Sequence, residues 1–175
     1  MAGDTKRAAL LVIDVQNGLF RASTRVFNEK QFLENVNALI TRAHAAGAPV
    51  FMIQHSADRF LVEGTDDWLV QPDVVRDQRE IPVHKKHGDS FEGTDLGEHL
   101  ARLGIRHVVV SGMVTHGCVK NTVLGALKRG YQVTLVKDAH TSYSKDAAQF
   151  VREWNEKLEQ KGAGLRAASE VVFQA

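Results

Sequence analysis

The chain has 175 residues, of which 43% are hydrophobic and 25% charged, and its formal net charge at pH 7 is +1. This size and composition predict one domain with its own core over residues 1–175. The small net charge gives no electrostatic reason to expect a nucleic acid or an anionic membrane as a partner. The apolar stretch near the N-terminus is too short for a signal sequence, no apolar run is long enough to span a membrane, and the single cysteine favours a reducing compartment, so we expect a cytoplasmic protein.

Strand-like and helix-like segments alternate along the chain. Continuous apolar runs predict strands at 8–13, 50–53, 81–83, 107–110, 132–136 and 170–173, and apolar residues at helical spacing predict helices at 29–46, 94–103, 118–129 and 145–160. Such alternation is typical of βαβ units, so we predict an α/β fold, a three-layer doubly wound sandwich with a mostly parallel central sheet of about six strands. Residues 56–80 are polar and irregular, and are either a binding loop or an insertion.

Polar and titratable side chains follow the predicted strands at the points where the strands end. In open parallel sheets, ligands bind beyond the carboxyl ends of the strands. We therefore expect a site at this edge of the sheet. The residues that follow the strands are Asp14, Gln54, His55, 84–87, 112–118, Asp138 and His140.

Cys118 is the only cysteine of the chain, and it falls in the first turn of a predicted helix. Unpaired N–H groups and the helix dipole at this position favour a thiolate, which is the nucleophilic form of cysteine. A free cysteine is more commonly a small buried hydrophobic residue. On position alone, both interpretations stay open.

A carboxylate and a lysine at neighbouring strand ends favour the nucleophile. Asp14 directly follows a buried strand, where a lone Asp ordinarily caps a turn. Beside a thiol, however, a carboxylate can take the thiol proton, and an ammonium group can hold both anions. Lys85 or Lys86 could supply that ammonium group, although either one alone would ordinarily be a surface lysine.

Other chemistries have little support in the sequence. There is no HExxH motif and no cysteine pair, so we favour hydrogen bonding or substrate contact over metal binding for the histidines at strand ends and expect no cofactor. The sequence also lacks GxGxxG, GxxxxGK[ST] and GxSxG, which argues against nucleotide binding and a serine hydrolase of the α/β-hydrolase type. The histidines in question are His55, His84, His87, His116 and His140.

Four segments in a fixed order carry a family resemblance. They are LLVIDVQNGLF (10–20), VHKKHGDSFEGTDL (83–96), VVVSGMVTHGCVKNT (108–122) and GYQVTLVKDAHTS (130–142). With them the chain resembles the isochorismatase-like cysteine hydrolases, a group that includes nicotinamidases and N-carbamoylsarcosine amidases, from about residue 8 to 173.

The resemblance implies a catalytic triad of Asp14, Lys85 and Cys118. Lys85 is chosen over Lys86 by its spacing from Phe91, and alternation along a strand would point the two lysines in opposite directions. The resemblance also implies a cis peptide at Val114–Thr115 and an oxyanion hole formed by the backbone N–H groups of Thr115 and Cys118.

The implied reaction is hydrolysis of an amide-like C–N bond in a small molecule. Asp14 would take the thiol proton, the thiolate would attack the carbonyl carbon, and water would hydrolyse the thioester. Members that use a metal for a pyridine substrate carry Asp-x-His where this chain has residues 54–56 (QHS), which disfavours nicotinamidase activity. The family is commonly oligomeric, so we expect a homo-oligomer. Candidate pocket residues are Gln16, Phe20, Trp68 and His116, the last at a position where the family often has Asp or Asn.

Three alternatives remain. Isochorismatases proper cleave a vinyl ether and typically lack the cysteine, so Cys118 argues against that reaction. A non-catalytic binding protein that kept the fold has no need for all three triad residues. A thiol-transfer protein would need an external partner, because the chain has no second cysteine.

Overall fold

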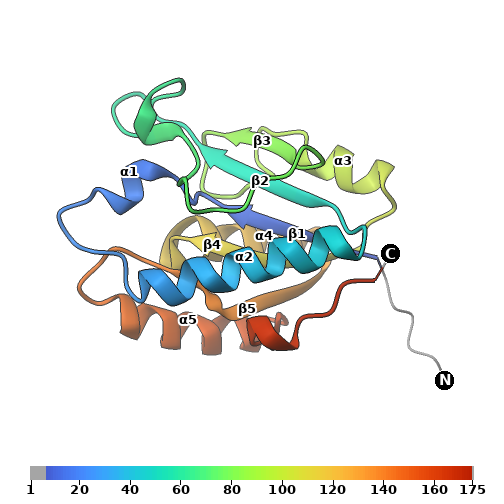
Figure 1. The fold of residues 1–175 in the computed structure, drawn as a ribbon. Coiled ribbons are helices and arrows are strands. Elements are labelled where there is room, and N and C mark those ends of the chain that lie inside the picture. The colour runs from blue at the N-terminus through green and yellow to red at the C-terminus, as the bar shows by residue number, and fades with distance from the viewer. Residues whose placement is uncertain (1–6, 175) are drawn as a thin grey trace.

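The structure, a computed structural model, describes residues 7–174, so residues 1–6 and 175 of the expected domain lie outside the described residues. Its centre is a six-stranded sheet in the order β3-β2-β1-β4-β5-β6 (Figure 1). Every pair of neighbouring strands is parallel, which confirms the predicted doubly wound α/β sandwich. The strands are β1 (Ala8–Ile13), β2 (Val50–His55), β3 (Ile81–Lys85), β4 (His107–Met113), β5 (Gln132–Thr141) and β6 (Gly164–Arg166).

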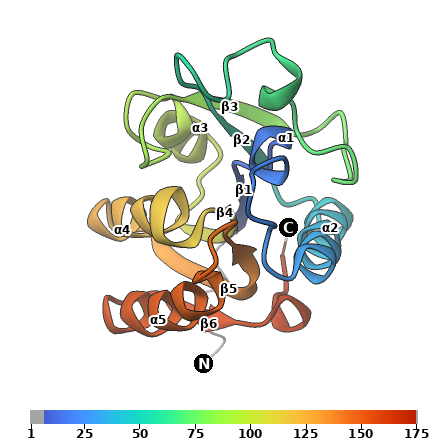
Figure 2. The same ribbon diagram turned by 90° about the vertical axis from the view of Figure 1, so that its left-hand side faces the viewer.

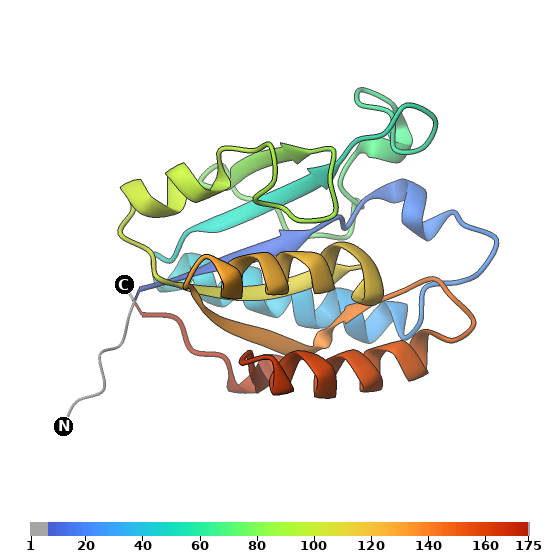
Figure 3. The ribbon, with the colours of Figure 1, turned by 180° about the vertical axis from the view of Figure 1, so that it is seen from behind.

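Helices cover both faces of the sheet. Figure 2 shows α2 on one face and α3, α4 and α5 on the other, and Figure 3 shows α4 lying across the sheet from behind. The strand β1 serves both layers, because Leu10 and Val12 pack toward α2 while Leu11 and Ile13 pack toward α3 and α4. The helices are α1 (Asn17–Phe20), α2 (Glu29–Ala45), α3 (Leu96–Arg102), α4 (Lys120–Lys128) and α5 (Ala147–Gln160).

The predicted strand at residues 170–173 is wrong. The last strand is β6, and a turn of 3-10 helix at Ala168–Glu170 follows it. The apolar run that suggested a strand has Val171 and Phe173 buried and Val172 exposed, as in a strand, although it forms none. The segment pairs with a helix instead, because Arg42 of α2 donates a hydrogen bond to the Val171 carbonyl at 2.9 Å and Val171 and Phe173 join the core on that face.

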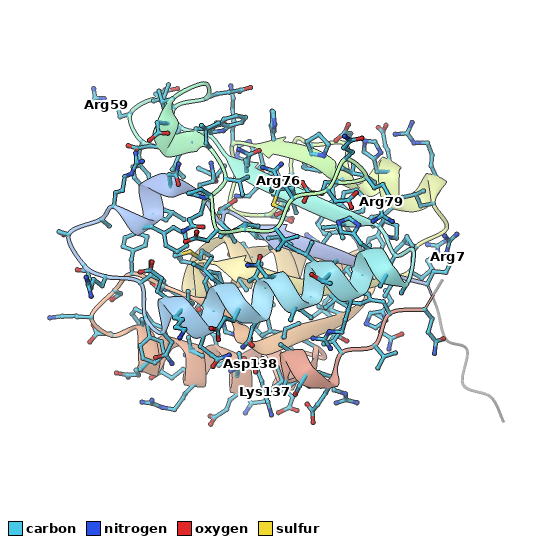
Figure 4. All side chains as sticks on the ribbon, viewed as in Figure 1. Arg7, Arg59, Arg76, Arg79, Lys137 and Asp138 are labelled. Carbon is cyan, nitrogen blue, oxygen red and sulfur yellow. The ribbon has the colours of Figure 1, made fainter. Side chains whose placement is uncertain are left out.

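The carboxyl ends of the strands lie at the left in Figure 1, beside the long loop 56–80. This loop is tied to the sheet edge by a bridge between Gln16 and Val70. Figure 4 shows Arg59 at the outer tip of the loop and Arg7 at the opposite end of the molecule. Within residues 7–174, the structure contains no helix with the length and apolar character needed to cross a membrane.

Gly112 sets the close contact between the two central strands. It pairs with Ile13 of β1 and has a φ of +119°, and a Cβ atom there would lie 2.1 Å from the Ile13 carbonyl oxygen. Only glycine, which has no Cβ, fits this backbone approach. The position matters for function because β1 and β4 end in Asp14 and in the turn that carries Cys118.

We therefore expect Gly112→Ala to destabilise the protein far more than Gly104→Ala. Gly104 also has a positive φ (+67°), but a Cβ there meets no atom within 4 Å. The control should cost about 1–2 kcal/mol for the left-handed backbone alone, whereas Gly112→Ala adds an overpacking penalty and should cost about 3 kcal/mol or more. Urea unfolding of the two variants measures the difference, and equal losses would contradict the close-contact explanation.

Candidate active site

Three chain segments bring Asp14, Lys85 and Cys118 together at the carboxyl edge of the sheet. The ammonium Nζ of Lys85 donates to Asp14 Oδ2 at 3.0 Å and lies at 3.1 Å, within hydrogen-bond distance, from Cys118 Sγ. The Lys85 side chain is completely buried and the Asp14 side chain is 4% exposed. A buried lysine is tolerated only when its charge is paired, and here Asp14 supplies the opposite charge.

Alternation along β3 explains why Lys85 enters this cluster and Lys86 does not. Val83 and Lys85 are buried while His84 is exposed, so the odd-numbered side chains at the end of the strand face inward. Lys86 follows the strand and is exposed. The sequence spacing that selected Lys85 thus agrees with where the structure places the two lysines.

Asp14 leaves β1 with a left-handed backbone, at φ +52°. Aspartate adopts this conformation more readily than most residues. The Asp14 N–H still donates to the Ile53 carbonyl at 2.9 Å, which fixes the residue at the end of the sheet. Its second carboxylate oxygen, Oδ1, is buried and has no hydrogen-bond partner among the described residues, so it is available to receive a proton.

Cys118 lies in a tight helical turn, Thr115–Val119, that precedes α4. The Val114 carbonyl accepts hydrogen bonds from the N–H groups of Gly117 at 3.0 Å and Val119 at 3.3 Å, which closes the turn around the cysteine. The expected position of the cis peptide is wrong by one residue. The cis bond joins Met113 to Val114, where β4 meets the turn, rather than Val114 to Thr115.

The surroundings of Cys118 favour the protonated thiol, whereas its position at a helix start favours the thiolate. Burial and, to a smaller extent, the negative charge of Asp14 raise the pKa of Cys118, and Lys85 only partly opposes them, so that the pKa is about 12. Burial also raises the pKa of Asp14, against the lowering effect of Lys85. The position at a helix start is therefore outweighed by the removal of water from the thiol.

His55 is a fourth member of the cluster, and the sequence indicated hydrogen bonding or substrate contact for it without naming a partner. It pairs with Lys85 across the β2–β3 ladder, and its Nδ1 lies 3.1 Å from the Lys85 Nζ. Burial lowers the pKa of His55 and Lys85 lowers it further, so the ring is neutral and Nδ1 can accept a Lys85 proton. The sequence held one signal for this contact. His55 and Lys85 follow the second and third predicted strands, and consecutive strands are commonly neighbours in a sheet.

The same cluster contains a possible metal-ligand set. The nearest donor atoms of Asp14, His55 and Cys118 all lie within 4.8 Å of one another. Lys85 Nζ, however, lies 3.0–3.1 Å from one donor atom of each. A metal would have to share this space with a buried ammonium of the same sign, so the donor set fits a lysine-centred site rather than a metal centre.

The four candidate pocket residues have different surroundings. Gln16 is fully buried, and its amide donates to the carbonyls of His55 and Trp68 and accepts from the His55 N–H, so it fixes the chain at both residues. The Trp68 indole N–H donates to the Ser56 hydroxyl at 2.9 Å. The other two are half-buried, Phe20 against the α2-side core and His116 with its ring 4.3 Å from that of Phe150.

The chain is similar in sequence to a known protein family and to characterised proteins. Residues 8–163 match the family model of the isochorismatase domain. The chain therefore belongs to the isochorismatase-like hydrolase family. A streptothricin hydrolase of Streptomyces noursei is 35% identical over 147 residues, covering 83% of this chain and 58% of that protein.

Two other similarities support the family and the fold. The uncharacterised isochorismatase family protein YddQ of Bacillus subtilis is 33% identical, with 75% of this chain and 76% of that protein covered. The crystal structure of an isochorismatase from Pseudomonas putida KT2440 superimposes with a TM-score of 0.87 at 23% identity, over 95% of this chain and 90% of that one. The chain thus spans less than two thirds of the streptothricin hydrolase but most of the other two proteins.

The paired lysines give a matched test of the buried ion pair. Lys85→Met leaves the Asp14 carboxylate buried without its partner and should cost about 3–5 kcal/mol of unfolding free energy. The exposed Lys86→Met should change it by no more than about 0.5 kcal/mol. The pKa of Asp14 is raised in the folded protein and should rise further without Lys85. The folded state of Lys85→Met then binds the Asp14 proton more tightly than the unfolded state does, so its unfolding free energy falls as the pH rises. The loss of unfolding free energy in Lys85→Met should therefore be larger at pH 8 than at pH 5.

Urea unfolding of both variants at the two pH values measures these effects. The additional substitution Asp14→Asn should restore part of the stability that Lys85→Met loses, because it removes the unpaired charge. Equal stability of the two lysine variants would contradict the buried ion pair.

Alkylation of the single cysteine tests the protonation state. With a pKa of about 12, Cys118 should react with iodoacetamide at pH 7 more slowly than glutathione does. Asp14→Asn removes a charge that raises this pKa, so the variant should be alkylated at least about threefold faster. Asp58→Asn, an exposed control, should react like the unmodified protein. Slower alkylation of Asp14→Asn than of the control would show that Asp14 lowers the pKa of the thiol.

Proposed function

We propose that the protein is a cysteine hydrolase that cleaves the C–N bond of a small amide, ureide or carbamoyl compound through a thioester. The observation that carries this proposal is the single ammonium group of Lys85, which contacts both the Asp14 carboxylate and the Cys118 sulfur at 3.0–3.1 Å in a buried site. Membership of a hydrolase family and the similarity to a streptothricin hydrolase support hydrolysis as the reaction class.

In the first step the thiol proton moves from Cys118 to Asp14. The unpartnered Oδ1 of Asp14 is the acceptor, and the negative charge moves from oxygen to sulfur. Lys85 contacts the other carboxylate oxygen, Oδ2, at 3.0 Å and the sulfur at 3.1 Å, so the negative charge stays at nearly the same distance from the ammonium group while the net charge of the site does not change. A thiol whose pKa is raised can thus ionise internally without releasing a proton to water.

The thiolate then attacks the carbonyl carbon of the substrate. The C–S bond forms as the C=O π electrons move to oxygen, and backbone N–H groups of the turn that holds Cys118 donate to the oxyanion. Collapse of this intermediate breaks the C–N bond, and Asp14 returns its proton to the leaving nitrogen. Water then attacks the thioester with Asp14 as base, which releases the acid and restores the thiol.

The alternatives use fewer of these features. Hydrolysis of a vinyl ether needs no thiol, so it leaves Cys118 without a role. A non-catalytic binding protein has no reason to bury an Asp–Lys–Cys cluster, because a buried charge pair stabilises a fold no better than apolar residues of the same size. We also retain two predictions that accompany the proposed enzyme, a cytoplasmic location and assembly into a homo-oligomer.

A screen of small primary amides, ureides and carbamoyl compounds for ammonia release tests the reaction. With any compound that is turned over, Cys118→Ala and Cys118→Ser should lower kcat at least about 1000-fold, since the nucleophile is lost. Asp14→Asn should also lose turnover even though its thiol reacts faster with iodoacetamide. The matched control Lys86→Met should keep its activity.

Two results would contradict the proposal. Normal ammonia release by folded Cys118→Ala would exclude a thioester. Conversion of a vinyl ether to an alcohol and a carbonyl compound, with no ammonia release from any nitrogen compound, would favour the alternative reaction.

A further inference from the structure

A chain of hydrogen bonds runs from the half-buried Asn155 of α5 through the buried His140 of β5 to the turn that holds Cys118. Asn155 donates from Nδ2 to the Lys137 carbonyl at 3.2 Å, and its Oδ1 lies 2.9 Å from His140 Nε2. On the other side of the ring, His140 Nδ1 lies 2.8 Å from the Thr115 hydroxyl. Figure 4 shows Lys137 and Asp138 at the lower side of the molecule, where β5 meets the helices.

The direction of every bond in this chain follows from its first member. Because Nδ2 of Asn155 donates to a carbonyl, Oδ1 faces His140 and can only accept, so the proton of the ring is on Nε2. Burial lowers the pKa of His140 to about 4, so near neutral pH the ring carries one proton and Nδ1 is an acceptor. The Thr115 hydroxyl must therefore donate to His140.

Thr115 is the first residue of the helical turn Thr115–Val119 and is completely buried. Its hydroxyl proton is committed to His140, so the side chain is an anchor and cannot donate to a substrate. We propose that His140 and Asn155 are positioning residues that fix Thr115, and through it the turn that aims Cys118 at its substrate. The inference rests on the proposed function, because it assigns this turn to catalysis.

Few charged groups among the described residues act on the His140 ring. Asp138, on the same strand, is the charged group that acts on the ring. The groups that meet the ring from α5 and from the turn, Asn155 and Thr115, are neutral. A new charge at position 155 therefore acts on the ring without competition from those two directions.

We refer to the hydrogen-bond chain Asn155–His140–Thr115 as the relay. Asn155→Asp adds a charge to it at nearly the same side-chain shape and replaces the Nδ2 donor to the Lys137 carbonyl with an oxygen. The carboxylate still accepts from Nε2 but stabilises a protonated ring, so it raises the pKa of His140. Once protonated, Nδ1 carries a hydrogen and can no longer accept the Thr115 proton. We expect alkylation of Cys118 by iodoacetamide in this variant to show an extra step of at least about threefold, at the pH where NMR shows His140 titrating.

Asn37→Asp is the matched control. Asn37 also donates from Nδ2 to a carbonyl, that of Asp73, and accepts at Oδ1 from the Val75 N–H, but it lies on α2 outside the relay. Its alkylation profile should follow that of the unmodified protein. A relay that serves only stability would lower the unfolding free energy of Asn155→Asp without producing a step at the midpoint of His140.

A second pair of variants tests the relay if Asn155→Asp does not fold. Thr115→Val has the same shape without the hydroxyl and should change the alkylation rate at least about threefold at fixed pH, while Thr115→Ser should recover much of the original rate. In the unmodified protein, nitrogen NMR of His140 should show the proton on Nε2. The proposal fails if that proton is on Nδ1, if His140 does not shift in Asn155→Asp, or if Thr115→Val and Thr115→Ser react alike.

These measurements read the cysteine and the imidazole ring and do not depend on turnover. Absence of ammonia release together with an intact relay would reject the proposed reaction alone. Ammonia release together with a proton on Nδ1 of His140 would reject the relay alone.

Discussion

The site depends on one buried ammonium group. Lys85 Nζ lies 3.0–3.1 Å from Asp14 Oδ2, His55 Nδ1 and Cys118 Sγ, so it neutralises the carboxylate and defines where the sulfur lies. Without this ammonium group, burial of Asp14 would leave an unpaired charge, which proteins seldom tolerate. The sheet meets this requirement by its order, since β1 is flanked by β2 and β4 while β3 lies just beyond β2.

The buried lysine also explains how an unreactive thiol can serve as a nucleophile. Burial raises the pKa values of both Asp14 and Cys118. The ion pair with Lys85 opposes this effect at Asp14, so the carboxylate stays the negative partner and the thiol is the group that does not ionise easily by exchange with water. When a proton passes from Cys118 to Asp14, the negative charge moves from the carboxylate to the sulfur. The sum of this charge and the positive charge of Lys85 stays zero. The two groups therefore titrate as a coupled pair, and the thiolate forms only as the partner of a protonated Asp14.

The sequence was sufficient for the features that depend on short patterns. Apolar runs located β1 to β5 but not β6, and strand ends located Asp14 and the region of Cys118. The spacing from Phe91 selected Lys85, and alternation indicated that Lys85 and Lys86 point in opposite directions. Three features depend on contacts between distant segments and could not be predicted this way. Val171 and Phe173 are buried by packing near α2 rather than by pairing in a strand. Burial raises the pKa of Cys118 and so favours its protonated form. His55 contacts Lys85 because β2 is the neighbour of β3 in the sheet.

The ammonium group of Lys85 has more hydrogen-bond neighbours than protons. An ammonium group has three protons, yet Nζ has four neighbours within 3.1 Å, which are Asp14 Oδ2, His55 Nδ1, the His87 carbonyl and Cys118 Sγ. A neutral thiol is the weakest acceptor of the four, so at rest the three protons go to the oxygens and the imidazole. When the sulfur becomes anionic it is a stronger acceptor than the neutral His55 ring and the His87 carbonyl. His55 is then the partner that gives up its Lys85 proton to the sulfur. Lys85 thus stabilises the sulfur more strongly after ionisation than before, which is the differential interaction that a nucleophile needs.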